Sequence, residues 1–155
     1  MDAYLRNLRA KVGHDLIKAP CAGIVPRDAQ GRIGLVRRSD DGTWGLVGGW
    51  MGPGENVLRC AVREMLEETG FTVEVTGLLG IYSEPDQMRW TYPNGDQAEF
   101  VTIVFEAKIL EKVGETDGEA LEFTLFAPED LPEIRLNDAQ IIRDAVSQGS
   151  RPFIR

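Results

Sequence analysis

Apolar residues recur at helical spacing in the middle of the chain, between residues 57 and 69. On a wheel of about 100° per residue, the apolar positions that gather on one side are Leu58, Val62, Met65 and Leu66. Asn56 can cap the first turn with its side chain, and Gly70 can adopt the left-handed conformation that ends many helices. The pattern predicts an amphipathic helix over residues 57–69.

Runs of apolar and β-branched residues predict strands on both sides of this helix. The predicted strands cover residues 21–25, 32–37, 71–83, 98–109 and 121–126. The first two flank a turn-rich linker and predict a hairpin, and Asn94-Gly95 predicts a turn before the fourth. A last helix is expected at 137–146 with Asn137 as its cap. This order predicts an α/β fold with helices packed on a mixed sheet.

A separate helical pattern precedes this domain. Its apolar positions, between residues 4 and 17, are Tyr4, Leu5, Leu8, Val12 and Leu16. We expect a short amphipathic helix within residues 1–18 that packs on the body of the protein or on a second copy in a homodimer. Residues 19–155 are expected to form one domain, as is usual for a chain of this length.

The net charge of the chain restricts the kinds of binding partner that we expect. The chain has 17 basic and 25 acidic residues, a formal net charge of −8, and no run of lysines or arginines. Such a balance lacks the electrostatic footprint of proteins that bind DNA, RNA or anionic membranes, so we expect no nucleic-acid polymer and no membrane as a partner. No stretch reaches the ~20 apolar residues of a membrane span and no signal peptide is recognisable, so a cytoplasmic location is expected.

The cysteine and histidine residues of this chain do not predict a redox, zinc or catalytic-triad site. Cys21 and Cys60 are separated by 39 positions, which fits neither a redox motif nor a zinc-ligand pair, so both are expected to be buried apolar residues. The single histidine, His14, lies in the polar N-terminal segment and is expected at the surface. A Ser-His-Asp triad in the body of the fold is therefore disfavoured.

Three glutamates lie on an arc of about 100° nearly opposite the apolar side of the predicted helix: Glu64, Glu67 and Glu68. Like charges four residues apart cost about 0.2–0.5 kcal/mol, and the last turn of a helix favours cations. One interpretation is a solvated acidic face. The other is a metal site whose function offsets this cost, and clustered carboxylates without His or Cys suit Mg²⁺ or Mn²⁺ before Zn²⁺.

A glycine-rich stretch leads into this helix, with Gly48 and Gly49 placed to let the backbone approach a ligand closely. We expect a shaped loop here. It is not a phosphate-binding P-loop, because no Lys-Ser or Lys-Thr follows, and neither GxGxxG nor GxSxG is present.

Residues 49–71, GWMGPGENVLRCAVREMLEETGF (the box), resemble the signature of the Nudix hydrolases, G-x5-E-x7-R-E-U-x-E-E-x-G-U, in which U is a bulky apolar residue. The fixed positions that match are Gly49, Glu55, Arg63, Glu64, Glu67, Glu68 and Gly70. One departure lies just upstream, where Leu46-Val47-Gly48-Gly49 replaces the Leu-Pro-Gly-Gly of many relatives and alters the rigidity of the loop. The resemblance implies a Nudix fold, an α/β/α sandwich with a central mixed sheet and a loop-helix-loop.

The resemblance also implies a metal site. In such enzymes the carboxylates of this helix bind Mg²⁺, for which Mn²⁺ can substitute, and here these are Glu64, Glu67 and Glu68. The carbonyl of Gly49 would complete the shell, and Glu55 would be a weaker or supporting contact. A substrate with two or more negative charges would be repelled by this acidic site without the metal.

Family members place the base that activates water either in this segment or in a later loop. We favour Glu67 or Glu68, each as ligand and base together, with Glu119 as the alternative because it lies in a loop before the last strand. A solvated surface role fits Glu119 equally well. By the same resemblance Arg63 orients the glutamates through ion pairs.

The implied activity is hydrolysis of a diphosphate linkage in a nucleoside diphosphate joined to another group X, with ADP-ribose or a nucleotide-sugar favoured. Alternatives are a nucleoside triphosphate pyrophosphohydrolase and a non-catalytic module that senses a nucleotide-sugar; the intact glutamate set argues against the second. Candidate substrate contacts are Arg37, Arg38, Trp50, Arg89 and Trp90. Further aromatic rings that could stack a base are Trp44, Tyr82 and Tyr92.

Overall fold

The computed structural model describes residues 3–155. In chain order the elements are α1 (Ala3–Val12), β1 (Ile17–Arg27), β2 (Ile33–Arg38), β3 (Trp44–Gly45), β4 (Val47–Trp50), α2 (Val57–Thr69), β5 (Phe71–Tyr82), α3 (Pro85–Met88), β6 (Arg89–Thr91), β7 (Gln97–Lys112), β8 (Ala120–Phe126), α4 (Leu136–Val146) and β9 (Phe153–Ile154). None of the helices within these residues is long and apolar enough to cross a membrane.

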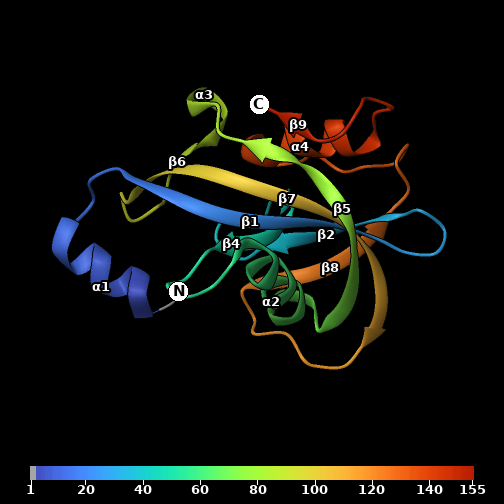
Figure 1. Cartoon of the computed structure of the whole chain (residues 1–155). Coiled ribbons are helices and arrows are strands. Elements are labelled where there is room, and N and C mark those ends of the chain that lie inside the picture. Colours follow the sequence, from blue (N-terminus) through green and yellow to red (C-terminus); the bar gives the residue numbers. More distant parts are fainter. Residues whose placement is uncertain (1–2) are drawn as a thin grey trace.

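The strands form one mixed sheet, with β1 and β7 side by side in its middle (Figure 1). β1 runs parallel to β7, from Ile17 opposite Ala98 to Arg27 opposite Lys108, and antiparallel to β2 and β4. β5 pairs antiparallel with β7 on the other side, β8 pairs with β2, and β9 lies parallel to β5. The predicted mixed sheet and its long strands are confirmed.

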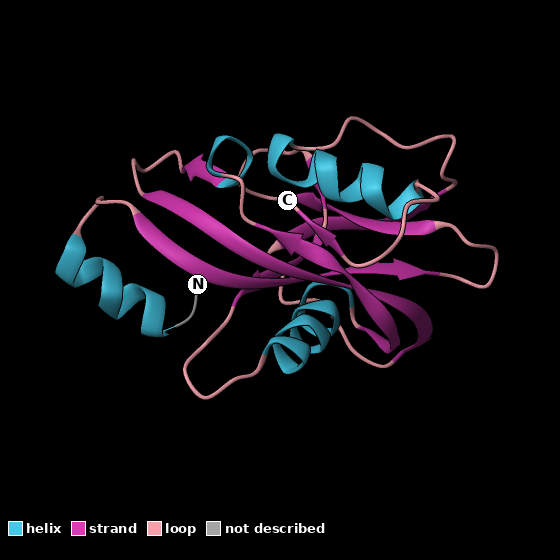
Figure 2. Ribbon diagram, turned by 45° about the horizontal axis from the view of Figure 1, so that its top comes forward, coloured by secondary structure: helices cyan, strands magenta, loops and turns pink. Residues whose placement is uncertain are grey.

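Helices cover both faces of this sheet (Figure 2). α2 lies on one face, and α3 and α4 lie on the other. Successive strand residues point to opposite faces: Val25 of β1 packs in a core with Ile141 of α4, whereas Ile24 packs in a second core with Met65 of α2. The predicted α/β/α sandwich is therefore confirmed, with the sheet between two cores.

α2 begins and ends where the sequence predicts. Asn56 Oδ1 accepts a hydrogen bond from the backbone N–H of Arg59 (2.9 Å) at the start of the helix. At the other end Gly70 has φ 75°, and its N–H donates to the carbonyl of Leu66 (2.8 Å). The two caps fix the length of the helix that carries the glutamates.

The apolar stripe of α2 is not the side that packs on the sheet. Leu58, Val62 and Leu66 are exposed, and only Met65 of the stripe is buried. The buried side contains the small residues Cys60 and Ala61. Small side chains let the helix backbone approach β1 and β4 closely, which places the glutamates next to the sheet. Burial of both cysteines, Cys60 here and Cys21 on β1, is confirmed.

Two predicted boundaries differ near the start of the chain and before α2. α1 ends at Val12, five residues earlier than predicted, because Gly13 with φ 61° turns the chain. Gly48 and Gly49 lie in strand β4 and not in a loop, because β4 pairs with β1. A Cβ atom on Gly48 would lie 2.5 Å from the Ala22 carbonyl oxygen, so this pairing requires glycine.

The predicted cap of α4 is wrong. Arg135 occupies the cap position without a side-chain hydrogen bond, and Asn137 lies inside the first turn. The Asn137 side chain is buried, and its Nδ2 donates to the carbonyl of Gln87 (2.6 Å) in α3. The contact of Asn137 with α3 thus takes the place of the predicted cap.

The Asn94-Gly95 turn is confirmed, although it joins β7 to the short strand β6 and not directly to β5.

Candidate active site

Arg63 on α2 connects the acidic residues of segment 49–71. Its Nε and Nη2 donate to the two carboxylate oxygens of Glu55 (2.8 and 3.0 Å), and its Nη1 donates to Glu64 (2.7 Å) and Glu67 (2.8 Å). The hydrogen bonds with Glu55 raise the pKa of Arg63 above its usual value and lower the pKa of Glu55. Arg63 therefore stays charged and ties the loop before α2 to the helix.

Glu64 lies directly against strand β4. A Cβ atom on Gly49 would collide with the Glu64 carboxylate, so glycine is needed for this approach. The side chain of Glu64 is 12% exposed, and burial raises the pKa of its carboxyl group. The contact brings the backbone of Gly49 and a carboxylate to the same place.

Glu68 is the most deeply placed of the three glutamates. The residue is 4% exposed, and its Oε2 has no hydrogen-bond partner among the atoms that the structure describes. Burial raises the pKa of Glu68 to about 8; repulsion from Glu64 adds to this effect, and attraction to Arg38 opposes it. The interpretation as a solvated acidic face is therefore wrong for Glu68.

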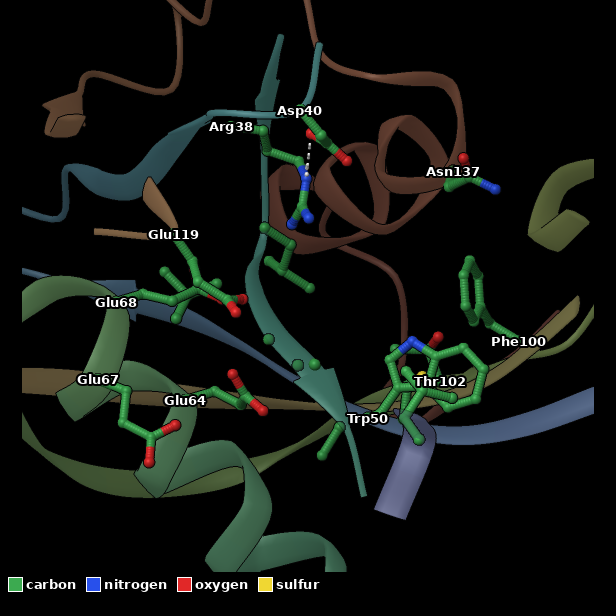
Figure 3. A pocket seen from close by; sticks show the side chains of 18 of the residues that line it. Arg38, Asp40, Trp50, Glu64, Glu67, Glu68, Phe100, Thr102, Glu119 and Asn137 are labelled. Atoms are coloured by element: carbon green, nitrogen blue, oxygen red, sulfur yellow. Dashed lines mark hydrogen bonds and ion pairs between the residues drawn. The ribbon is translucent and has the colours of Figure 1, made fainter. Parts of the chain in front are cut away.

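Glu67 and Glu119 lie at the rim, where α2 meets the loop before β8. The Glu67 carboxylate is 45% exposed. Asp117 N–H donates to the Glu67 carbonyl (2.8 Å), and the Ser39 hydroxyl donates to the Glu119 carbonyl (2.7 Å). These bonds fix the loop beside α2, and Figure 3 shows the side chain of Glu119 on the same side of the pocket as the box glutamates.

These acids line one end of a cleft of about 1200 Å³. Arg38, from the end of β2, also lines it and donates to Asp40 (3.1 Å; Figure 3). Further along, the cleft is lined by the aromatic rings of Trp50, Tyr92 and Phe100. The cleft thus joins clustered carboxylates, one arginine and a set of flat apolar faces.

A family model described as the NUDIX domain matches residues 17–145. The chain belongs to the Nudix family. The match covers more than the box, since it runs from the start of β1 into α4. The resemblance based on residues 49–71 is confirmed, and the chain is a Nudix hydrolase.

Relatives along most of the chain agree with this assignment. A MutT-like protein of Streptomyces ambofaciens is 33% identical over 154 residues, which cover 98% of this chain and 91% of that protein. An ADP-ribose pyrophosphatase of Methanocaldococcus jannaschii is 33% identical over 125 residues, 79% of this chain and 69% of the other. The solved structure of a MutT Nudix hydrolase from Burkholderia pseudomallei is 27% identical with a TM-score of 0.66, covering 84% of this chain and 99% of that one.

The residues of the box fit the divalent metals that Nudix hydrolases use. Glu68 presents a buried, unpartnered oxygen, and the Glu64 carboxylate touches the backbone of Gly49. Oxygen donors of this kind suit Mg²⁺ and Mn²⁺. Within residues 3–155 no three acidic, His or Cys side chains are arranged as a ready-made metal site. Arg63 holds one oxygen each of Glu64 and Glu67.

Only some of the candidate substrate contacts reach the cleft of this Nudix hydrolase. Arg38 and Trp50 line it, whereas Arg37, Arg89 and Trp90 are not among its lining residues. Arg37 Nη1 lies 3.8 Å from Glu122, and Arg89 donates to Glu99 (2.8 Å). These arginines instead form ion pairs away from the cleft lining.

Two of the rings named as base-stacking candidates belong to the core. Trp44 packs edge-on against Phe126, with centroids 4.9 Å apart. Tyr82 is fully buried, and its hydroxyl donates to Asp144 (3.2 Å). Neither ring lines the cleft, and Tyr82, which has no exposed surface, cannot stack on a substrate. Tyr92 does line the cleft.

No sequence pattern predicted the second polar group of the cleft, which lies at the start of α4. Arg135 lies with its guanidinium carbon 4.2 Å from the Trp90 ring, and Asn137 lines the cleft beside it. Arg135 Nε and Asn137 Oδ1 are buried without partners among the described atoms. No local motif marks these residues, because only the packing of α3, β6 and α4 brings them to the cleft.

Proposed function

We propose that this Nudix hydrolase cleaves the diphosphate linkage of a nucleoside diphosphate joined to another group, of the ADP-ribose or nucleotide-sugar type. The observation that carries the proposal is the buried pair Glu64 and Glu68 on one side of a cleft of about 1200 Å³. The carboxylate-rich side suits a metal-bound diphosphate, and the rest of the volume suits the groups that the diphosphate joins. The relative from Methanocaldococcus, named an ADP-ribose pyrophosphatase, supports this choice.

We propose Mg²⁺ as the metal, with Mn²⁺ as a substitute, held by Glu64, Glu67 and Glu68 with the carbonyl of Gly49. The bound ion would polarise phosphoryl oxygens, neutralise charge on the leaving phosphate and lower the pKa of a bound water. Glu55 has both oxygens engaged by Arg63 and also accepts from Gly52 N–H (3.2 Å). Its proposed role is to position Arg63.

We assign separate roles in substrate binding and proton transfer to the other polar side chains of the cleft. Arg38 would bind a phosphoryl oxygen, because its guanidinium lies in the cleft near Glu68. A box glutamate, Glu67 or Glu68, would accept the proton of the attacking water, with Glu119 as the alternative base. Arg135 Nε and Asn137 Oδ1 offer an unused donor and acceptor to the group beyond the diphosphate.

A panel of substrates tests the proposal. ADP-ribose, nucleotide-sugars, dinucleoside polyphosphates and nucleoside triphosphates are each incubated with Mg²⁺ or Mn²⁺, and both products are identified. We expect the highest kcat/KM on ADP-ribose or a nucleotide-sugar, giving two monophosphates. Highest activity on a triphosphate with release of pyrophosphate would establish the alternative activity, and binding without turnover on every member would establish a sensing module.

A further inference from the structure

Helix α1 lies outside the matched Nudix domain but forms part of its cleft. The family match begins at residue 17, and α1 covers Ala3–Val12. Figure 1 shows α1 beside the sheet, joined to β1 by a short turn. The cleft that contains the three glutamates of α2 is nevertheless also lined by Tyr4, Leu5 and Arg9. A segment outside the common domain therefore contributes side chains to the site.

Arg9 holds α1 in this position. The side chain of Arg9 is 10% exposed and donates to the carbonyls of Gln97 (2.7 Å) and Asp15 (2.8 Å). Its Nε also lies 3.5 Å from the buried carboxylate of Asp96. Asp96 pairs in turn with His14 Nδ1 (2.7 Å). Two contacts of Arg9, with Gln97 and Asp96, thus hold α1 to the segment between β6 and β7, and the contact of His14 with Asp96 holds the turn after α1 to the same segment.

The part of the cleft near this turn is rich in aromatic side chains. Trp50 and Phe100 meet edge to face with centroids 6.0 Å apart, and Tyr92 lines the same cleft. Tyr4 adds a fourth ring, and Leu5 adds a buried apolar side chain. Stacked aromatic faces bind nucleobases irrespective of sequence. Glu64, Glu67 and Glu68 lie on the opposite side of the cleft from Trp50 and Phe100 (Figure 3), where the proposed function places the diphosphate.

We propose that α1 forms one wall of a nucleobase subsite, with Tyr4 in contact with the base and Arg9 as a positioning residue that holds the helix in place. This inference rests on the proposed function, since it assigns the nucleoside part of the substrate to the aromatic end. A phosphate-bearing ligand with a base should then depend on α1, and the same ligand without a base should not.

Binding of monophosphates tests this directly in the presence of Mg²⁺. The dissociation constants of AMP, GMP, CMP and UMP are compared with that of ribose 5-phosphate, which lacks a base. For the tightest nucleotide we expect Tyr4→Ala and Arg9→Gln to weaken binding about tenfold, with ribose 5-phosphate changed less than about twofold. Tyr4→Phe keeps the ring and should bind like the parent protein. Leu8→Ala, on the same helix but not in the cleft lining, is the matched control.

Several results would overturn the inference: no nucleotide binding more tightly than ribose 5-phosphate, unchanged nucleotide binding in Tyr4→Ala, or equal weakening of both ligands. If Arg9→Gln fails to fold, the Tyr4 pair of variants decides. Failure of the proposed function looks different, because the parent protein would then hydrolyse no diphosphate substrate while the base-dependent loss in Tyr4→Ala remained.

Discussion

Glu64, Glu67 and Glu68 share one helix face but differ in their surroundings. Glu67 is open to solvent and paired with Arg63, Glu64 lies against Gly49, and Glu68 is buried with one oxygen unpartnered. A buried carboxylate without full compensation is costly for folding, and its raised pKa reports that cost. A cation bound at this point would remove it, which explains why the arrangement suits a metal site.

Replacing Glu68 therefore separates stability from activity. We expect Glu68→Gln to leave the metal-free protein as stable or more stable by roughly 0.2–0.5 kcal/mol, because burial and, to a lesser extent, repulsion from Glu64 disfavour the charged carboxylate of Glu68. Turnover at saturating Mg²⁺ should fall about 10²-fold or more. Urea unfolding and steady-state kinetics measure the two effects, with Glu74→Gln on the exposed part of β5 as the control. Near-normal turnover in Glu68→Gln would refute the site.

The position of the general base gives a second residue-scale prediction. Glu119→Gln should lower kcat less than Glu67→Gln or Glu68→Gln does, because the base is expected on α2. The comparison is made at saturating metal, with metal affinity measured separately by titration. A larger loss in Glu119→Gln with unchanged metal affinity would place the base in the loop before β8.

At the scale of elements, local patterns predicted α2, β5, β7 and β8 well. Caps at Asn56 and Gly70 and β-branched runs act through near neighbours, so sequence suffices for them. Asn137 was misassigned because its amide reaches Gln87, fifty residues earlier in the chain. The box was recognisable from spacing alone, whereas Arg135 and the α1 contribution depend on packing between distant segments.

The fastening of α1 gives an element-scale prediction. The hydrogen bond from His14, with further contacts to Asn94 and Arg9, lowers the pKa of Asp96 in the folded protein. The stability that Asp96 contributes is therefore present above the ordinary Asp pKa of about 3.9 and is lost as pH falls through the lower, folded-state value.

Asp96→Asn should destabilise the protein near neutral pH and flatten the fall in unfolding free energy below about pH 4. Urea unfolding at a series of pH values measures this, with Asp130→Asn at an exposed position as the control. An acid-side slope equal to that of the parent protein would show that Asp96 carries no such linkage.

At the scale of the whole molecule, the sheet separates two roles. One face packs against α2, which presents the carboxylates, and the other packs against α3 and α4, which bring Arg135 and Asn137 to the same cleft. With a net charge of −8, the molecule as a whole repels an anionic substrate. A divalent metal and the arginines of the cleft are the local positive charges that make binding of a diphosphate favourable.

Hydrolysis of ADP-ribose in ¹⁸O-labelled water tests the central claim most directly. With Mg²⁺ present, we expect one ¹⁸O atom per turnover in a phosphate group, either of AMP or of ribose 5-phosphate, as mass analysis of both products would show. We also expect turnover to stop when the metal is removed with a chelator and to return when Mg²⁺ is added back. Label on carbon, or unchanged turnover without metal, would contradict metal-assisted attack of water at phosphorus.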